Sequence, residues 1–145
     1  MPKLSWVAGP KWTDDGRRDP PAAPDFLVMA SRLELRSYRD FVPFLRASLA
    51  IRRQCKATAG NVGHALAVDI GPNRFWTLSS WRSRADLDEF VRQQPHLDVM
   101  QRFKPALRTA VFAFFPATTG QRPASWAHVE DILAAEERGR TEQSS

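Results

Sequence analysis

The segment from residue 61 to residue 103 constrains the fold most, because two strand-like runs and a helix-like run follow each other with little chain between them. Apolar residues alternate through residues 61–70, and a second apolar run covers residues 75–81. Glycine, proline and asparagine at positions 71–73 are typical of a tight turn. The two runs therefore predict an antiparallel hairpin.

A helix is predicted directly after this hairpin. Ser83 is suited to accept a hydrogen bond from the first turn, and Asp86 three residues later completes a pattern close to a capping box. Pro95 lies inside the apolar pattern that follows, where it removes a backbone donor and should bend the helix. The expected apolar stripe consists of Leu87, Phe90, Val91, Leu97 and Met100.

The chain before the hairpin predicts a strand and a helix. Over residues 26–36, one set of alternate residues is apolar except for Ser31, and this set is expected to face the core. Apolar residues then recur at four-residue spacing from Phe41 to Leu49, as in an amphipathic helix. The solvent-exposed side of this helix is expected to carry Arg46, Arg52, Arg53 and Lys56, and Gly60 is expected to end the helix.

A last apolar run at residues 110–115 predicts a fourth strand, which Pro116 ends. The order β-α-β-β-α-β indicates an α+β, ferredoxin-like fold, a four-stranded antiparallel sheet with both helices on one face. The other face of such a sheet is left without a helix. It is therefore expected to need a partner.

Composition divides the chain into three parts. Residues 1–24 hold five of the eleven prolines and two tryptophans, which predicts an extended arm that packs on its own domain or on a partner subunit. Residues 25–116 make up the ferredoxin-like domain. Residues 117–145 are expected to contain a loop, a short helix and a disordered tail beyond Gly139.

Charge and motifs exclude several classes of protein. The net charge is +5, but the arginines are scattered along the chain, so no nucleic-acid partner is predicted. Cys55 is the only cysteine, and no apolar run is long enough for a signal peptide or a membrane span, so a cytoplasmic protein without a membrane partner is expected. No metal-ligand spacing, P-loop or dinucleotide fingerprint appears.

The run FWTLSSWRSRADLDEFVRQQPHLDVMQRF, residues 75–103, resembles the third strand and second helix of the dimeric α+β barrel superfamily. The likeness is to its antibiotic-biosynthesis-monooxygenase-like and spheroidene-monooxygenase-like proteins, and with the flanking elements it covers residues 25–116. It implies a homodimer whose two sheets face each other, with one pocket per subunit between sheet and helices. The residues that carry it are Ser80, Trp81, Leu87, Phe90, His96 and Met100.

The resemblance implies a monooxygenase-like tailoring enzyme that acts on an aromatic or polyene small molecule without a bound cofactor. In this hypothesis His96, with Ser31, takes a proton from the substrate to give an electron-rich anion that reacts with oxygen. Two alternatives remain open: a haem-binding oxygenase or carrier with His96 as axial ligand, and a non-catalytic dimeric ligand-binding module. The staphylococcal-type haem degraders place Asn, Trp and His where this chain has Ser31, Phe90 and Met100, which argues against their mechanism.

The candidate site residues each have a structural interpretation as well. His96 follows Pro95 at the predicted bend, where it is either a base or metal ligand, or a residue that caps the second half of the helix. His64 lies on an apolar strand face, which favours a structural role over a place in the site. The remaining candidates for lining the pocket are Trp76, Trp81, Phe90 and Met100; most are expected to be core residues, with Trp76 or Trp81 at the pocket.

Overall fold

A computed structural model of the chain describes residues 7–8, 26–117, 123 and 125–144. Its strands are β1 Val7–Ala8, β2 Phe26–Leu35, β3 Asn61–Asp69, β4 Arg74–Trp81 and β5 Leu107–Ala117. Its helices are α1 Phe41–Ala57, α2 Arg84–Arg92, α3 His96–Phe103 and α4 Trp126–Ser144, with single 3-10 turns at Tyr38–Asp40 and Lys104–Ala106.

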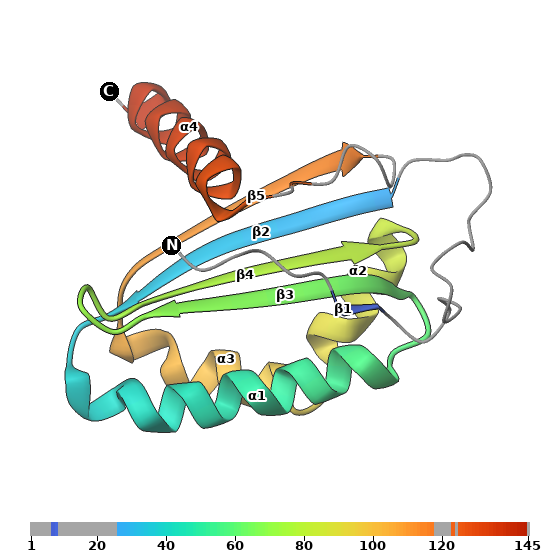
Figure 1. Ribbon diagram of the computed structural model, residues 1–145, viewed down its shortest axis with the longest axis horizontal. Coiled ribbons are helices and arrows are strands. Elements are labelled where there is room, and N and C mark those ends of the chain that lie inside the picture. The colour runs from blue at the N-terminus through green and yellow to red at the C-terminus, as the bar shows by residue number, and fades with distance from the viewer. Residues whose placement is uncertain (1–6, 9–25, 118–122, 124, 145) are drawn as a thin grey trace.

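The strands form one antiparallel sheet in the order β1-β3-β4-β2-β5 (Figure 1). Helices α1, α2 and α3 cover one face of this sheet, and α4 lies across the other face. The elements from β2 to β5 follow the predicted β-α-β-β-α-β order, so the ferredoxin-like α+β fold is confirmed. No helix in the described part of the chain is both long and apolar enough to cross a membrane.

The β3–β4 hairpin forms as the sequence predicts. Asn73 has a φ of 59°, a left-handed conformation that asparagine tolerates better than most residues. Its backbone N–H donates to the carbonyl of Ile70 at 3.0 Å, which closes the turn. The tight connection fixes the register of the two strands, with His64 opposite Ser79 and Val68 opposite Phe75.

The helix predicted after the hairpin is two helices rather than one bent helix. Ser83 caps α2 as expected, since its hydroxyl accepts the N–H of Asp86 at 3.1 Å. The helical conformation stops at Arg92, because Pro95 has no N–H and disfavours helical backbone in the residue before it. A new helix, α3, then begins at His96.

Two expectations for α1 need correction. The helix ends at Ala57 rather than at Gly60, and Gly60 instead allows the chain to pass close to α2. A Cβ atom at Gly60 would lie 2.4 Å from Cγ of Asp86. Leu49 is 38% exposed and does not belong to the buried stripe, whose fully buried members are Phe44 and Cys55.

The helix-facing side of the sheet carries an aromatic cluster. The ring of Phe44 on α1 lies 4.7 Å from that of Phe75 on β4 and 5.1 Å from that of Phe103 on α3. Both contacts are edge-to-face, a favourable geometry for aromatic pairs. Leu33 and Leu35 of β2 pack into the same cluster, so the predicted core-facing set of this strand is confirmed at this end.

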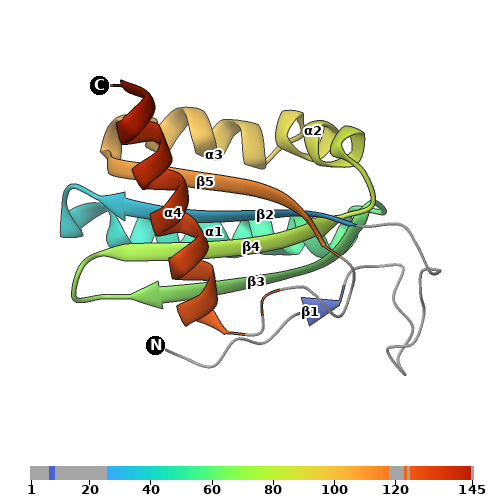
Figure 2. The same ribbon diagram turned by 90° about the horizontal axis from the view of Figure 1, so that it is seen from above.

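The expectation that the other sheet face lacks a cover within the chain is wrong. Val28 and Ala30 of β2 are completely buried on that face, and they pack in one cluster with Trp126, Val129 and Leu133 of α4. Figure 2 shows α4 running obliquely across the strands. The helix also continues to Ser144, well past Gly139, so the predicted short helix and disordered tail are not observed in the described residues.

A buried polar network fastens α4 to the sheet. Arg32 of β2 is only 8% exposed, and its guanidinium pairs with Glu130 and with Glu137, the latter at 2.9 Å. The indole Nε1 of Trp76 donates to the second oxygen of Glu130 at 2.7 Å. A buried charge requires such partners, because removing it from water is costly. The network therefore fixes where α4 sits on the sheet.

Only two residues of the predicted N-terminal arm are described. Val7 and Ala8 form β1, which pairs with the edge of β3 opposite His64 and Gly63. The rest of residues 1–24 lies outside the described residues, and so do residues 118–122. The predicted boundaries of the arm and of the C-terminal segment stay predictions.

Candidate ligand-binding cavity

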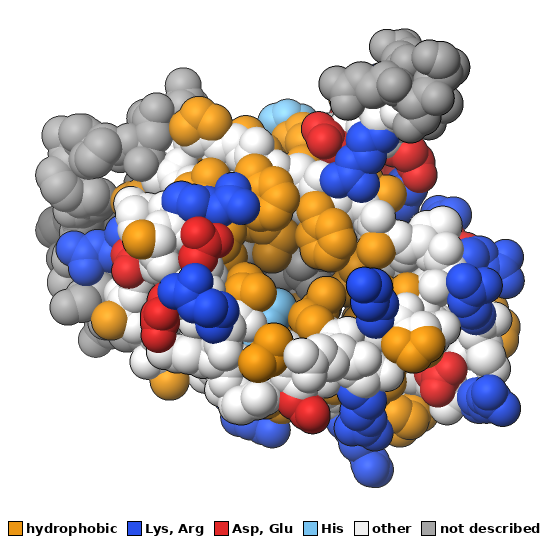
Figure 3. Space-filling view, turned by 180° about the vertical axis from the view of Figure 1, so that it is seen from behind, with side chains coloured by type: hydrophobic (Ala, Val, Ile, Leu, Met, Phe, Trp, Pro, Cys, Tyr) orange, Lys and Arg blue, Asp and Glu red, His pale blue; other side chains and the backbone are white. Residues whose placement is uncertain are grey.

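A cavity of about 520 Å³ lies between the helix-facing side of the sheet and helices α1, α2 and α3. This size falls in the range of small-molecule sites. Figure 3 shows hydrophobic side chains around a hollow, with histidine surface visible inside it. The apolar walls include Met29, Leu33, Phe44, Ile51, Leu66, Leu87, Phe90, Val99, Met100 and Phe112, and the polar groups among them include Ser31, Arg52, His64, Thr77 and His96.

The structure brings together most of the site residues predicted from the sequence. Ser31, His64, Phe90, His96 and Met100 all line the cavity, although they come from β2, β3, α2 and α3. Ser31 and His64 reach it from the sheet, and the other three reach it from the helices. Their catalytic or binding roles stay predictions.

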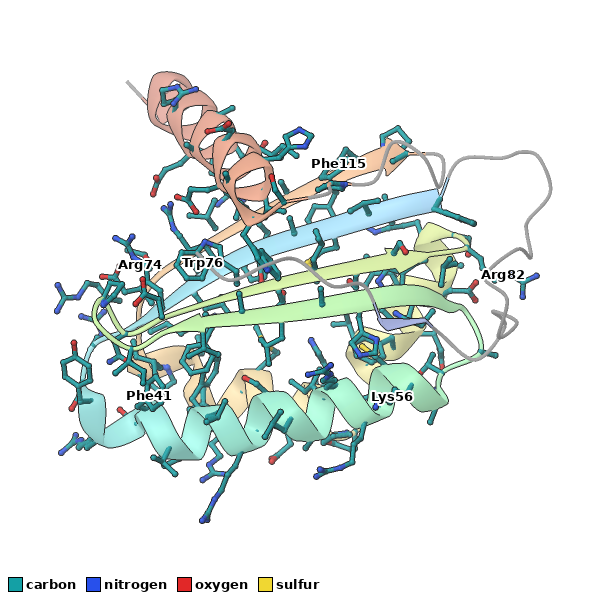
Figure 4. The ribbon with its side chains drawn as sticks, viewed as in Figure 1. Phe41, Lys56, Arg74, Trp76, Arg82 and Phe115 are labelled. Atoms are coloured by element: carbon teal, nitrogen blue, oxygen red, sulfur yellow. The ribbon has the colours of Figure 1, made fainter. Side chains whose placement is uncertain are left out.

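Neither predicted tryptophan lines the cavity. Trp76 points to the opposite side of the sheet, toward α4, whereas Phe41 and Lys56 lie on the α1 side (Figure 4). Trp81 is completely buried behind the cavity wall, with its ring 4.7 Å from that of Phe90. Its Nε1 donates to Ser79 Oγ at 2.8 Å, so its polar atom is already satisfied.

The position of His96 is fixed by a residue that the sequence did not single out. Gln54 on α1 accepts the backbone N–H of His96 at 3.0 Å and donates from Nε2 to the carbonyl of Phe90 at 3.1 Å. This one amide thus joins α1 to both sides of the break between α2 and α3. The His96 ring lies against Phe90, with 5.1 Å between ring centres.

The His96 imidazole is suited to accept a proton. Its Nδ1 is buried and has no hydrogen-bond partner among the described residues. Burial lowers the pKa of His96, and a hydrogen bond with the Val91 backbone partly opposes this effect. The ring is therefore expected to be neutral near pH 7, with one nitrogen lone pair available.

His64 is more deeply buried than His96, and its surroundings are positively charged. The side chain is 4% exposed, and neither ring nitrogen has a partner among the described residues. Burial, followed by the charges of Arg52 and Lys56, lowers its pKa to about 4. The structural role favoured from the sequence would require hydrogen bonds that the described residues do not supply. Within the described part of the chain, His64 instead presents an unpaired donor and an unpaired acceptor.

Two hydroxyl groups form a polar point on the sheet wall. Ser31 is 1% exposed, and its hydroxyl is hydrogen-bonded to that of Thr77, which lies directly opposite on β4. Only one hydroxyl proton is needed for this bond, so the other stays available to a ligand oxygen. Thr77 was not predicted, although its alternation with Ser79 and Trp81 places it on the helix-facing side.

Arg52 is the third site residue, after Gln54 and Thr77, that the sequence interpretation missed. It lines the cavity from α1, and its buried Nε has no partner among the described residues. Helical spacing gives the signal, because Arg52 is four residues after Ser48 and eight after Phe44, which also line the cavity. Cys55 lies on the same stripe, and burial raises its pKa to about 12, so its thiol stays protonated.

Side chains of α2, β5 and α4 surround the cavity at the β5 edge of the sheet. The guanidinium of Arg84 lies 4.7 Å from the ring centre of Phe114, which is 46% exposed, and its Nε pairs with Asp88 at 3.1 Å. Arg140 of α4 donates to the carbonyl of Phe112 at 3.3 Å. The described residues contain no group of three or more His, Cys, Asp or Glu side chains able to hold a metal ion.

Comparisons with known proteins give a match at the level of structure only. No protein-family model matches the sequence, and no curated protein matches it. A solved antibiotic biosynthesis monooxygenase superposes with a TM-score of 0.58 and 15% identity, over 63% of this chain and 98% of that protein. The chain has the fold of an antibiotic biosynthesis monooxygenase.

Two further structures extend this comparison. SnoaB, a cofactor-independent oxygenase from Streptomyces nogalater, matches with a TM-score of 0.55 and 16% identity, over 66% of this chain and 96% of SnoaB. A candidate monooxygenase from Lactobacillus acidophilus matches with a TM-score of 0.57 and 14% identity. The match covers 67% of this chain but only 49% of the Lactobacillus protein. At such identities the likeness shows the fold and leaves the reaction open.

Proposed function

We propose that the chain is a monooxygenase-like enzyme that acts on an aromatic or polyene small molecule without a bound cofactor. The observation that carries this proposal is an apolar cavity of about 520 Å³ into which two neutral imidazoles and a hydroxyl pair project. Apolar walls suit a flat substrate, and few polar groups suffice to orient it. The shared fold with SnoaB, described as a cofactor-independent oxygenase, supports the same reaction class.

In this mechanism His96 is the general base. Its unpaired Nδ1 takes a proton from an acidic hydroxyl or an activated C–H group of the substrate, while Ser31 or Thr77 donates to a substrate oxygen. The resulting anion gives its electrons to dioxygen. When an activated CH₂ carbon becomes a carbonyl, one oxygen atom enters the product and the other leaves as water. The substrate supplies all four electrons, so no other reductant is needed.

His64 is the weaker candidate for the base. A pKa of about 4 makes the His64 imidazole too weak a base to take a proton efficiently from the substrate. Burial also lowers the pKa of His96. The positive charges of Arg52 and Lys56, which lower the pKa of His64 further, do not contribute to the shift of His96. We therefore assign proton transfer to His96 and ligand binding to His64.

The test is oxygen consumption with a hydroxyanthrone, a flat probe with an activated CH₂ group between two rings. His96→Gln should lower kcat about a hundredfold or more, because a positioned general base contributes roughly that factor. His128→Gln is the matched control, since His128 lies exposed on α4. Turnover in His96→Gln within a factor of two of the wild type would contradict the assignment of the base. Probe binding without oxygen uptake would instead favour the non-catalytic ligand-binding module.

The haem alternative has one observation in its favour, the unpaired imidazole nitrogens inside an apolar cavity. His96 would hold the haem iron through a ring nitrogen, and haem would supply the redox chemistry. Titration of the purified protein with haem distinguishes this function from the first. A saturable shift of the Soret band that His96→Gln removes would support it, and the absence of such a shift would exclude it.

The homodimer implied by the resemblance also belongs to this proposal. In that arrangement two sheets pair through the face opposite the helices. Because α4 occupies this face here, we infer that sheets pair face to face only if α4 moves away, and that a dimer which keeps α4 in place uses another surface.

A further inference from the structure

We propose that Arg52 and His64 form an anion-binding subsite inside the cavity, so that the ligand is a flat apolar molecule carrying one acidic oxygen group, such as a carboxylate or a phenolate. This inference rests on the cavity of the proposed function being the ligand site, and it narrows the substrate class. The charge of Lys56, like that of Arg52, contributes to the lowered pKa of His64.

No carboxylate of the described residues pairs with Arg52. The other two arginines among the described cavity-lining residues each have one: Arg84 pairs with Asp88 at 3.1 Å, and Arg140 pairs with Glu136 at 3.7 Å. Arg52 makes no hydrogen bond or ion pair with any described residue, and its Nε is buried. A guanidinium carries five donors and no acceptor, so an anion is the ligand that best compensates its partial burial.

The His64 imidazole also lacks a hydrogen-bond partner among the described residues. His64 reaches the cavity from β3 on the sheet wall, while Arg52 reaches it from α1 on the helix wall. Both side chains line the same cavity, and the positive charge of Arg52 is one cause of the lowered pKa of His64. Neither nitrogen of His64 has a partner among the described residues, and a neutral imidazole always keeps one N–H donor. One anionic oxygen group between the two walls would accept from both side chains.

The rest of the described cavity surface is mainly apolar and offers no competing carboxylate. Among the described lining residues the acidic one is Asp88, and it is paired with Arg84. No carboxylate of the described cavity therefore competes for Arg52. Elsewhere the walls are aliphatic and aromatic, which suits an extended ring system. Charge complementarity at one end would then set the orientation of the ligand and present its other end to His96.

The test compares two fluorescent probes that differ by one charge. Anilinonaphthalene sulfonate carries a sulfonate, and N-phenyl-1-naphthylamine is the same ring system without it. Arg52→Gln should weaken binding of the sulfonate probe about tenfold or more, since a charge-assisted hydrogen bond contributes roughly that factor, while the neutral probe should bind as before. His64→Gln should change the same ratio in the same direction, and Arg52→Lys should restore most of it.

Arg53→Gln is the matched control, because it removes the same charge from an exposed neighbouring position on α1. It should change neither affinity by more than a factor of two. An unchanged ratio of the two affinities in Arg52→Gln, or an equal loss of both, would overturn the subsite. Wild-type protein that binds neither probe would overturn it as well. Preserved probe selectivity together with an inactive oxygenase assay would overturn only the proposed reaction.

Discussion

His64 shows how one residue links the cavity to the stability of the fold. Its pKa is about 4 in the folded chain and about 6.5 in an unfolded chain, because the folded chain keeps the ring dry and close to positive charge. Between these two values the unfolded state binds more protons than the folded state. Stability is therefore complete above about pH 6.5 and decreases as the pH falls toward 4.

By pH 5 the loss attributable to His64 should be about 2 kcal/mol, and His96, whose pKa burial also lowers, should add to it in the same direction. Urea unfolding at pH 7.5 and pH 5.0 measures this difference. His64→Gln should show a clearly smaller loss than the wild type, whereas His128→Gln should lose as much as the wild type. An identical loss in His64→Gln would show that the ring is hydrated in the folded chain.

Sequence periodicity located some of the site residues and misplaced others. Alternation correctly put Ser31 on the helix-facing side of β2, but the same rule places Trp76 and Trp81 on opposite faces of β4. Trp76 shares its face with Leu78, and therefore faces α4. Arg52 was assigned to solvent because of its charge, although helical spacing puts it beside Ser48 and Ile51. For Arg52 the position on the helix, rather than the charge of the side chain, decides that it lines the cavity.

At the scale of elements, neighbouring residues predict turns and helix caps correctly, whereas contacts between residues far apart in the sequence are not predicted. The hairpin turn and the Ser83 cap depend on a few neighbouring residues, and both form as predicted. The apolar stripe of α4 is also evident in the sequence, but the residues of this helix alone do not determine which surface the stripe covers. Its location depends on Arg32, Glu130 and Trp76, which are far apart in the sequence and meet only in the folded chain.

Leu133 provides a direct test of the packing of α4. It is completely buried against the sheet, so Leu133→Ala should leave a cavity and lower the free energy of unfolding by about 2–5 kcal/mol. Leu49→Ala is the matched control, because it truncates a leucine that is 38% exposed on α1. It should lower the free energy of unfolding by less than about 1 kcal/mol. Equal and small costs for both variants in urea denaturation would contradict the docking of α4 seen here.

At the scale of the whole molecule, α4 replaces what a partner subunit was expected to provide. The sequence argument for a dimer assumed a bare apolar sheet face, and the chain buries that face itself with Trp126, Val129 and Leu133. Because α4 covers this face, only the resemblance now supports the homodimer. The mass of the protein in solution decides the question independently of either argument.

Removal of residues 126–145 should expose the face that contains Val28, Ala30 and Trp76 and leave Arg32 without its carboxylate partners. An apolar patch of this kind promotes association, so light scattering should give the truncated chain a larger multiple of its monomer mass than it gives the intact 16.4 kDa chain. Removal of residues 141–145 alone serves as the control, since it keeps Leu133 and the Arg32 network in place, and it should leave the mass ratio unchanged. The opposite outcome is that both truncated chains and the intact chain are dimers, while the backbone amides of α4 are protected from hydrogen exchange in the intact dimer. That result would show that the subunits associate through a surface other than the one α4 covers.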